Sequence, residues 1–140
     1  MSINEYKDME GLVIDNMDLI EVLKALSHEN RIRILNLLKE QDLCVCELES
    51  IMDVNQSNAS RHLSKLKNED LIIGVQKAQW VYYSINEDLF AEHKFLQELL
   101  DKELDALDIC IEDNQRLKKY KESALSCEEL SDSDLFEAEG

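Results

Sequence analysis

The 140-residue sequence contains no proline and only three glycines. Because these residues interrupt helices and build turns, their scarcity disfavours a turn-rich β fold and favours long helices. The sequence also lacks a charge-free apolar run close to the roughly 20 residues of a membrane-spanning helix. Its first residues have neither the basic start nor the apolar centre of a signal peptide. We therefore expect a cytoplasmic, mainly α-helical protein with one compact domain.

Basic residues are scarce as well, because 15 Lys and Arg stand against 31 Asp and Glu, for a net charge of −16. Such a charge normally counts against nucleic-acid binding, since affinity for phosphate comes from lysine and arginine. The acidic excess is concentrated in residues 87–140, which hold 17 acidic and six basic residues. Residues 54–86 instead hold four basic and two acidic residues. We therefore expect any DNA contact within residues 54–86.

Cysteine is present four times, as Cys44, Cys46, Cys110 and Cys127. In a reducing cytoplasm these thiols favour metal binding, redox sensing or inert burial over a disulfide framework. The sequence contains no convincing nucleophile and base set and no phosphate-binding loop. We therefore do not expect an enzyme.

Apolar residues at helical spacing predict four helices before residue 70, after a flexible N-terminal arm at residues 1–14. Asp15 or Asn16 can cap the first helix, which runs to about Ser27, and Ser27 or His28 can cap the second, which runs to about Glu40.

The third and fourth helices, at about 44–53 and 56–69, predict a helix-turn-helix. Asp42 and Asn55 are the expected caps of these helices. Asp53 lies between them, and aspartate tolerates the left-handed backbone of a tight interhelix turn.

Residues 71–77 and 80–85 are rich in β-branched and aromatic side chains and predict a β-hairpin. After Asn86, apolar residues at helical spacing predict one long helix to about residue 111, with a stripe that a second copy of the chain would bury. This stripe consists of Leu89, Leu96, Leu100, Leu104, Leu107 and Ile111. We expect residues 15–111 to form the domain and residues 112–140 to form an acidic, disordered tail.

Five blocks carry a resemblance to a known family: Ala-Leu-Ser at 25–27, Arg-Ile-Arg-Ile-Leu at 31–35, Leu-Cys-Val-Cys-Glu-Leu at 43–48, Gln-Ser with Ser-Arg-His-Leu at 56–63, and Trp-Val-Tyr-Tyr at 80–83. In order and spacing, over about residues 16–108, they resemble the ArsR family of metal-responsive repressors. The resemblance implies a mainly α winged helix-turn-helix with a long C-terminal dimerisation helix. It also implies a homodimer that leaves its double-stranded operator DNA when a metal or metalloid binds.

Carried over by position, the resemblance assigns DNA contacts and a dimer interface. The expected DNA contacts are Gln56, Ser57, Asn58, Ser60, Arg61, His62, Lys65, Lys77 and Gln79. The expected dimer contacts are Leu19, Leu23, Leu96, Leu100, Leu104 and Leu107. The sequence departs from the family pattern at Asp53, at Ala78 with Gln79, and at Glu49. Family members often have glycine at the first position, Gly and Arg at the second, and a third cysteine at the last.

Cys44 and Cys46 are expected at the start of the third helix, where a helix N-terminus lowers the pKa of a thiol. A spacing of two residues places side chains about 200° apart on a regular helix. Both sulfurs could then reach one ion only if the helix begins later or its first turn unwinds. We expect such a distortion to shift the fourth helix and release DNA.

Arsenite and antimonite suit three thiolates, so the expected third ligand is Cys110 or Cys127, with Cys110 favoured. A site with all four cysteines would instead suit cadmium, lead or zinc. A thiol redox sensor that uses Cys44 and Cys46 is a further alternative. In the metalloid and metal cases the ion is a regulatory ligand, and no cofactor is required.

Overall fold

The structure is a computed structural model that describes residues 17–123 and 125. Helices α1 (Leu19–Leu26) and α2 (Glu29–Glu40) come first, and strand β1 (Leu43–Cys44) leads into α3 (Val45–Met52) and α4 (Gln56–Asn68). After them come β2 (Ile72–Lys77), β3 (Trp80–Ile85), α5 (Glu87–Glu92), α6 (Lys94–Glu98), the π-helical turn η2 (Leu99–Glu103), the 3₁₀ turn η3 (Leu104–Ala106) and α7 (Asp108–Ser123). This order confirms the mainly helical winged helix-turn-helix prediction. None of the described helices is long and apolar enough to cross a membrane.

Polar side chains at the helix starts accept hydrogen bonds from amides that lack partners within the helix. Asp18 caps α1, His28 caps α2 and Asn55 caps α4, so the predictions for His28 and Asn55 are confirmed. Asp15 and Asn16 lie outside the described residues. The predicted cap at Asp42 is wrong, because the chain stays extended for two more residues and α3 begins after Cys44.

Helices α3 and α4 form the predicted helix-turn-helix. Asp53 ends α3 in the left-handed conformation, with φ 57° and ψ 51°. This conformation is tolerated by aspartate and allows the tight reversal into α4. Leu48 and Ile51 of α3 and Leu63 and Leu66 of α4 are buried in one hydrophobic core, which fixes the two helices to each other.

The hairpin prediction is confirmed, and a short third strand completes the sheet. The strand order is β1-β3-β2, with all pairs antiparallel. In β1, Leu43 pairs with Tyr83 and Cys44 pairs with Tyr82. Two residues are too few to show a period, so the sequence does not predict β1. The turn between β2 and β3 contains Ala78 at φ 56°, a backbone conformation that glycine adopts with less strain.

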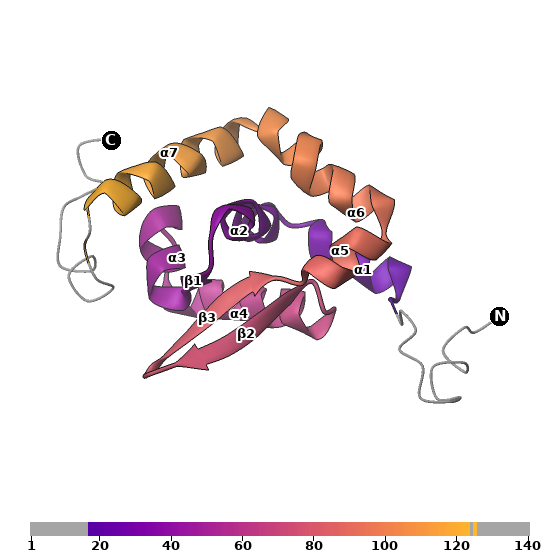
Figure 1. Cartoon of the computed structure of the whole chain (residues 1–140), viewed down its shortest axis with the longest axis horizontal. Coiled ribbons are helices and arrows are strands. Elements are labelled where there is room, and N and C mark those ends of the chain that lie inside the picture. Colours follow the sequence, from indigo (N-terminus) through magenta and orange to yellow (C-terminus); the bar gives the residue numbers. More distant parts are fainter. Residues whose placement is uncertain (1–16, 124, 126–140) are drawn as a thin grey trace.

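The predicted single helix after Asn86 is wrong, because the chain breaks twice. His93 and Leu107 both have extended backbones, with ψ 104° and 126°. A straight helix over residues 87–123 would be roughly 55 Å long and would leave the core behind. The breaks instead allow α5 to α7 to arch around α2 (Figure 1), so that Leu96 and Leu104 reach the same core.

The predicted tail is also wrong over residues 112–123, which form the C-terminal part of α7. Leu117 and Tyr120 are buried, and α7 packs along α2 and α3 on the side opposite the hairpin (Figure 1). The sequence-based signal for a tail was the charge of this segment. The structure shows instead an amphipathic helix with Glu112, Lys118, Lys121 and Glu122 on its exposed face. The predictions for residues 1–14 and 126–140 lie outside the described residues.

The leucines that the sequence assigns to a dimer interface do not all lie on the surface, because of the two breaks in the predicted helix. Leu96, Leu100 and Leu104 are 0%, 6% and 0% exposed, so the core of the single chain buries them and they are not available to a partner. This corrects their assignment to a dimer interface. The remaining residues of the expected set are exposed in the single chain, namely Leu19, Leu23 and Leu107.

Candidate thiol site and nucleic-acid interface

The thiol pair lies where β1 ends and α3 begins. Cys44 has extended backbone angles, φ −94° and ψ 170°, and occupies the N-cap position of α3, whereas Cys46 lies in the first helical turn. The helix therefore begins one residue later than Cys44. Of the two geometries that the sequence leaves open for ligation by both sulfurs, this is the later start of the helix.

The environment of Cys44 overturns the expected lowering of its thiol pKa. The side chain is 1% exposed, and this burial raises the pKa. The backbone amides of Glu47 and Cys46 oppose the shift without reversing it. Burial therefore favours the protonated thiol of Cys44, and a thiophilic ligand that bonds to its sulfur displaces that proton.

Glu47 connects Cys44 to the C-terminal helix. Its Oε1 accepts a hydrogen bond from the backbone N–H of Cys44 at 2.9 Å, and its backbone N–H donates to the Cys44 sulfur in a capping box. The hydroxyl of Tyr120 in α7 donates to Glu47 Oε2. Burial and this hydrogen bond raise the pKa of Tyr120. One buried carboxylate thus joins the start of α3 to α7.

The other end of α3 is held by arginines. Arg116 of α7 donates from Nε to the carbonyl of Ile51 at 2.5 Å and from Nη2 to the carbonyl of Ser50 at 3.2 Å. Arg33 of α2 donates to the carbonyl of Met52 at 3.0 Å. These cationic donors satisfy carbonyls at the negative end of the helix.

Arg33 also forms a bidentate ion pair with Asp113 of α7. Its Nε and Nη2 lie 2.7 and 2.9 Å from the two carboxylate oxygens, and the Asp113 side chain is 1% exposed. The hydrogen bond to Asp113 raises the pKa of Arg33, although burial opposes it. Charge pairs of this geometry are stronger than exposed pairs.

Cys110 is not brought to the thiol pair within one chain. It is fully buried on α7 against α2, where its carbonyl accepts a hydrogen bond from Asn36 at 3.4 Å. Ten residues separate it from Tyr120, which is about 15 Å along a helix. Cys44 and Cys110 are not disulfide-bonded. Cys46 is disulfide-bonded. Cys127 lies outside the described residues.

Among residues 17–123 and 125, no group of three or more Cys, His, Asp or Glu side chains is placed to hold a metal ion. The described part of the chain therefore supplies a pair of thiol positions and not a complete metal centre. The four-cysteine set of Cys44, Cys46, Cys110 and Cys127 is not assembled within these residues.

The outer face of α4 carries most of the expected DNA contacts in exposed positions. Gln56, Ser57, Ser60 and Arg61 are exposed. Arg61 donates to Asn58 Oδ1 at 2.8 Å, which holds its guanidinium close to the helix start. The face therefore presents hydrogen-bonding groups of the kind that read base edges in a major groove.

The charge of Lys65 is less available to DNA phosphates than that of Lys77 at the hairpin tip. Lys65 lies 3.5 Å from Glu21 and 3.8 Å from Glu69, so two acids already neutralise it. Lys77 and Gln79 are exposed at the tip, with Lys77 Nζ 5.6 Å from the ring centroid of Tyr82.

His62 is buried, 3% exposed, so its assignment as a DNA contact is corrected. Its Nδ1 lies 3.2 Å from Nη1 of Arg31, and its ring centroid is 4.2 Å from that of His28. Burial, with the nearby cations, lowers the pKa of His62 to about 4. Helical spacing indicates this position, because His62 continues the buried stripe of Ala59, Leu63 and Leu66.

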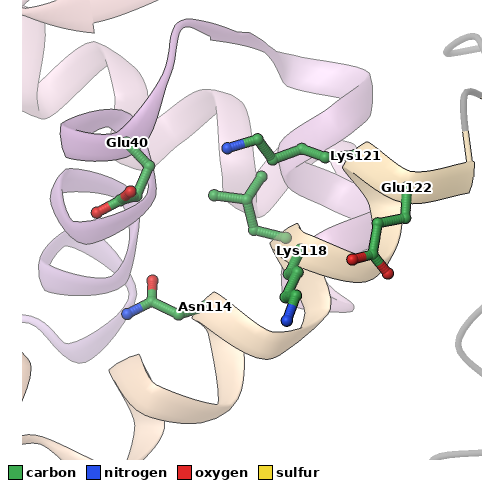
Figure 2. A pocket seen from close by; sticks show the side chains of 6 residues that line it. Glu40, Asn114, Lys118, Lys121 and Glu122 are labelled. Carbon is green, nitrogen blue, oxygen red and sulfur yellow. The ribbon is translucent and has the colours of Figure 1, made fainter.

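A surface pocket lies between the end of α2 and α7 (Figure 2). Glu40 enters it from α2, and Asn114, Lys118 and Lys121 line it from α7. Both charge signs are present, with two lysines and two glutamates among the lining residues, so the lining does not select a ligand of one charge.

Comparisons with known proteins agree with this geometry. A family model described as "Bacterial regulatory protein, arsR family" matches residues 28–73. The arsenic resistance transcriptional regulator ArsR2 of Pseudomonas putida is 36% identical over 100 residues, which are 70% of this chain and 84% of the relative. The chain belongs to the arsR family.

Other arsR-family comparisons extend this result. A cadmium resistance transcriptional regulatory protein CadC homolog of Staphylococcus aureus is 37% identical over 51% of this chain and 60% of its own length. The solved homodimeric winged helix-turn-helix DNA-binding domain of a possible ArsR-family regulator from Mycobacterium bovis aligns with a TM-score of 0.50 at 28% identity. That alignment covers 61% of this chain and 82% of the domain. This arsR-family chain is thus a DNA-binding transcriptional regulator and not an enzyme.

Sequence reasoning missed the residues that join α3 to α7, because it placed the end of the domain at residue 111. Glu47, Arg116 and Tyr120 were not candidates for a site. A continuing helical spacing of Cys110, Leu117 and Tyr120 could have indicated that α7 goes on, but the acidic composition after residue 121 outweighed it.

Proposed function

We propose that this chain is a homodimeric repressor that leaves its operator when arsenite or antimonite binds Cys44, Cys46 and a third thiol. The observation that carries the proposal is the position of both thiols at the start of α3, the first helix of the helix-turn-helix. The Pseudomonas putida relative, which aligns with this chain over 84% of its length, is named an arsenic resistance regulator, and this supports the choice of ligand.

The chemistry of the proposed site is exchange without a change of oxidation state. In the fully reduced protein, where Cys46 is no longer disulfide-bonded, three thiols replace the three hydroxyl groups of As(OH)₃. Three As–S bonds form, and three water molecules leave, each with one thiol proton. Soft thiolates suit such a thiophilic centre. The proton of the Cys44 thiol leaves in one of these water molecules.

The choice of the third thiol ligand depends on where Cys110 lies. Cys110 lies about 15 Å along α7 from the residue that contacts Glu47, which is too far for a shared ion within one chain. We therefore infer that Cys127 completes the site, in place of the favoured Cys110. This inference comes from the chain's supply of four cysteines and the placement of Cys110.

DNA binding is assigned to the outer face of α4 and the hairpin tip. Gln56, Ser57, Ser60 and Arg61 are exposed there, as are Lys77 and Gln79. A second copy of the chain would cover the exposed apolar residues of α1 and of the region where α7 begins, which are Leu19, Ile20, Leu23, Leu107 and Ile111. A dimer would place two α4 helices about one DNA turn apart.

Two observations each favour an alternative function. The similarity to a cadmium resistance regulator favours a cadmium, lead or zinc response. The disulfide at Cys46 favours a redox sensor, in which oxidation of thiols in place of ion binding releases DNA.

The deciding experiment is fluorescence anisotropy of the fully reduced dimer on a labelled fragment of its own upstream DNA. Arsenite, antimonite, cadmium, lead, zinc and peroxide are added separately. The proposal expects release by arsenite and antimonite at the lowest concentrations. Cys44→Ser and Cys46→Ser should bind the DNA and remain bound, and Cys110→Ser should behave like the wild type.

Normal arsenite-driven release of both Cys44→Ser and Cys46→Ser would overturn the proposed site. Release by cadmium alone or by peroxide alone would select the corresponding second candidate. Loss of release in Cys110→Ser with normal release in Cys127→Ser would restore Cys110 as the third ligand.

A further inference from the structure

We propose that Glu47 and Tyr120 are positioning residues that transmit ligand binding at Cys44 to α7 and thereby set the position of the reading helix. The inference rests on the proposed function, because it explains how occupation of the thiol pair releases DNA. It assigns a role to a carboxylate and a phenol that the thiol chemistry itself does not use.

The first step is the contact at the start of α3. Glu47 is 8% exposed and both of its carboxylate oxygens are engaged, one by the Cys44 backbone N–H and one by the Tyr120 hydroxyl. Tyr120 is itself 8% exposed. A buried carboxylate with satisfied partners is rigid, and loss of one partner leaves a polar atom without compensation.

The second step is that α7 holds the other end of α3 as well. Arg116 binds the carbonyls of Ser50 and Ile51, and Asp113 orients Arg33, which binds the carbonyl of Met52. Helix α3 is therefore attached to α7 at both ends. Since Asp53 allows only a tight turn into α4, a shift of α3 against α7 must move α4.

The third step concerns the dimer. Helix α7 also carries exposed Ile111, and Leu107 immediately precedes the helix; both belong to the surface assigned to the partner chain. The contact between α3 and α7 thus lies between the dimer surface and the reading helix. Its geometry sets how far apart the two α4 helices of a dimer lie on DNA.

The fourth step is what a ligand would disturb. The Cys44 sulfur accepts a hydrogen bond from the backbone N–H of Glu47, and Cys44 is 1% exposed. An arsenic atom bonded to this sulfur therefore needs space that Glu47 and its neighbours now fill. Movement of Glu47 removes the acceptor of the Tyr120 hydroxyl. The expected result is a loosened C-terminal end of α7, where Tyr120 lies, and a shifted α4.

The test compares Tyr120→Phe with Tyr83→Phe in the reduced, full-length protein without any inducer. Tyr83 lies half-buried on β3, opposite Leu43, and loses the same hydroxyl without a change at Glu47. N-ethylmaleimide labelling of Cys44 and Cys110 is followed by mass spectrometry. Cys110 is a buried thiol on the same helix as Tyr120 and reports general loosening of the fold.

In Tyr120→Phe, Cys44 labelling should accelerate by about fivefold, the effect of one lost hydrogen bond on local opening. Cys110 labelling should stay within about twofold of the wild type. Tyr83→Phe should change neither rate. Equal acceleration of Cys44 and Cys110, or no acceleration of Cys44, would overturn the inference.

A second pair of variants uses Glu47. Glu47→Ala should accelerate Cys44 labelling more than Tyr120→Phe does, because both carboxylate contacts disappear. Glu47→Gln keeps an acceptor for one partner and should restore part of the protection. If Glu47→Gln and Glu47→Ala accelerate labelling equally, Glu47 does not act through these hydrogen bonds and the inference is overturned.

Arsenite titration of DNA-bound Tyr120→Phe completes the test. Release should occur at about fivefold lower arsenite concentration than in the wild type. The labelling result does not depend on arsenite, so failure of the proposed function would leave it unchanged. An unaltered arsenite midpoint, together with accelerated Cys44 labelling, would show that the contact is structural and would overturn its role in release.

Discussion

The inner side of α3 and the outer side of α4 belong to one helix-turn-helix but differ in how their polar groups are used. On the inner side, Glu47 and the carbonyls at the end of α3 are all bonded to α2, α7 or the preceding strand. On the outer side, Gln56, Ser57 and Ser60 are exposed to solvent.

This difference separates two kinds of free energy. Bonds made within the chain contribute to folding, and their removal lowers the free energy of unfolding. Groups that stay exposed contribute little to folding and are available to a binding partner. We therefore expect inner substitutions to change stability and outer substitutions to change DNA affinity.

The largest expected effect is on the inner side, at Asp113. Asp113→Ala leaves the Arg33 guanidinium without its buried carboxylate, and breaking such a pair lowers the free energy of unfolding by about 3 kcal/mol. Urea denaturation followed by circular dichroism measures the change. The control Glu21→Ala removes pairs with Lys24 and Lys65 that are much more exposed, and should change it by less than about 1 kcal/mol. Equal losses of unfolding free energy in the two variants would contradict the larger contribution of the buried ion pair.

The next effect is a pH dependence from His62. Its pKa is about 4 in the folded chain against an ordinary value of 6.5, so the unfolded chain binds more protons between these values. The contribution of His62 to stability should therefore be constant above pH 7 and fall by about 2 kcal/mol between pH 7 and pH 5. His62→Gln should remove this part of the slope. An unchanged slope in the variant would show that other groups cause it.

Arg61 tests the outer side. Arg61→Ala should weaken operator binding about tenfold and change the free energy of unfolding by less than about 0.5 kcal/mol, because the side chain is exposed. Fluorescence anisotropy and urea denaturation measure the two quantities. Gln115→Ala, at an exposed position on α7, should change neither. A stability loss as large as that of Asp113→Ala would contradict the division between the two sides.

The smallest expected effect is at the hairpin tip. Ala78 has φ 56°, so Ala78→Gly relieves a left-handed conformation and should raise the free energy of unfolding by about 0.5 kcal/mol. The matched change Ala106→Gly, at an exposed helical position without positive φ, should lower it by a similar amount. A loss of stability in both variants would mean that Ala78 is not strained.

The sequence predicts the outer side better than the inner side. Exposed α4 residues follow from helical spacing and from the local positive charge, and Asn55 and Asp53 mark the ends of the helix-turn-helix. These signals are local. The buried position of His62 is available from the same spacing, since it lies on the stripe of Ala59, Leu63 and Leu66.

The inner side depends on contacts between residues far apart in the chain. The Glu47–Tyr120 and Arg33–Asp113 pairs join residues separated by 73 and 80 positions. No local pattern relates such residues, and charge alone marked residues 112–123 as a tail. The raised pKa of the Cys44 thiol also depends on distant contacts, because burial by distant segments outweighs the effect of the helix start.

The most direct test of the account is hydrogen exchange of the reduced, full-length protein with and without arsenite. The account predicts faster exchange in peptides that cover residues 45–52 and 113–123 when arsenite binds, with little change at residues 72–85. It is contradicted if arsenite releases the operator while exchange over residues 45–52 and 113–123 stays the same.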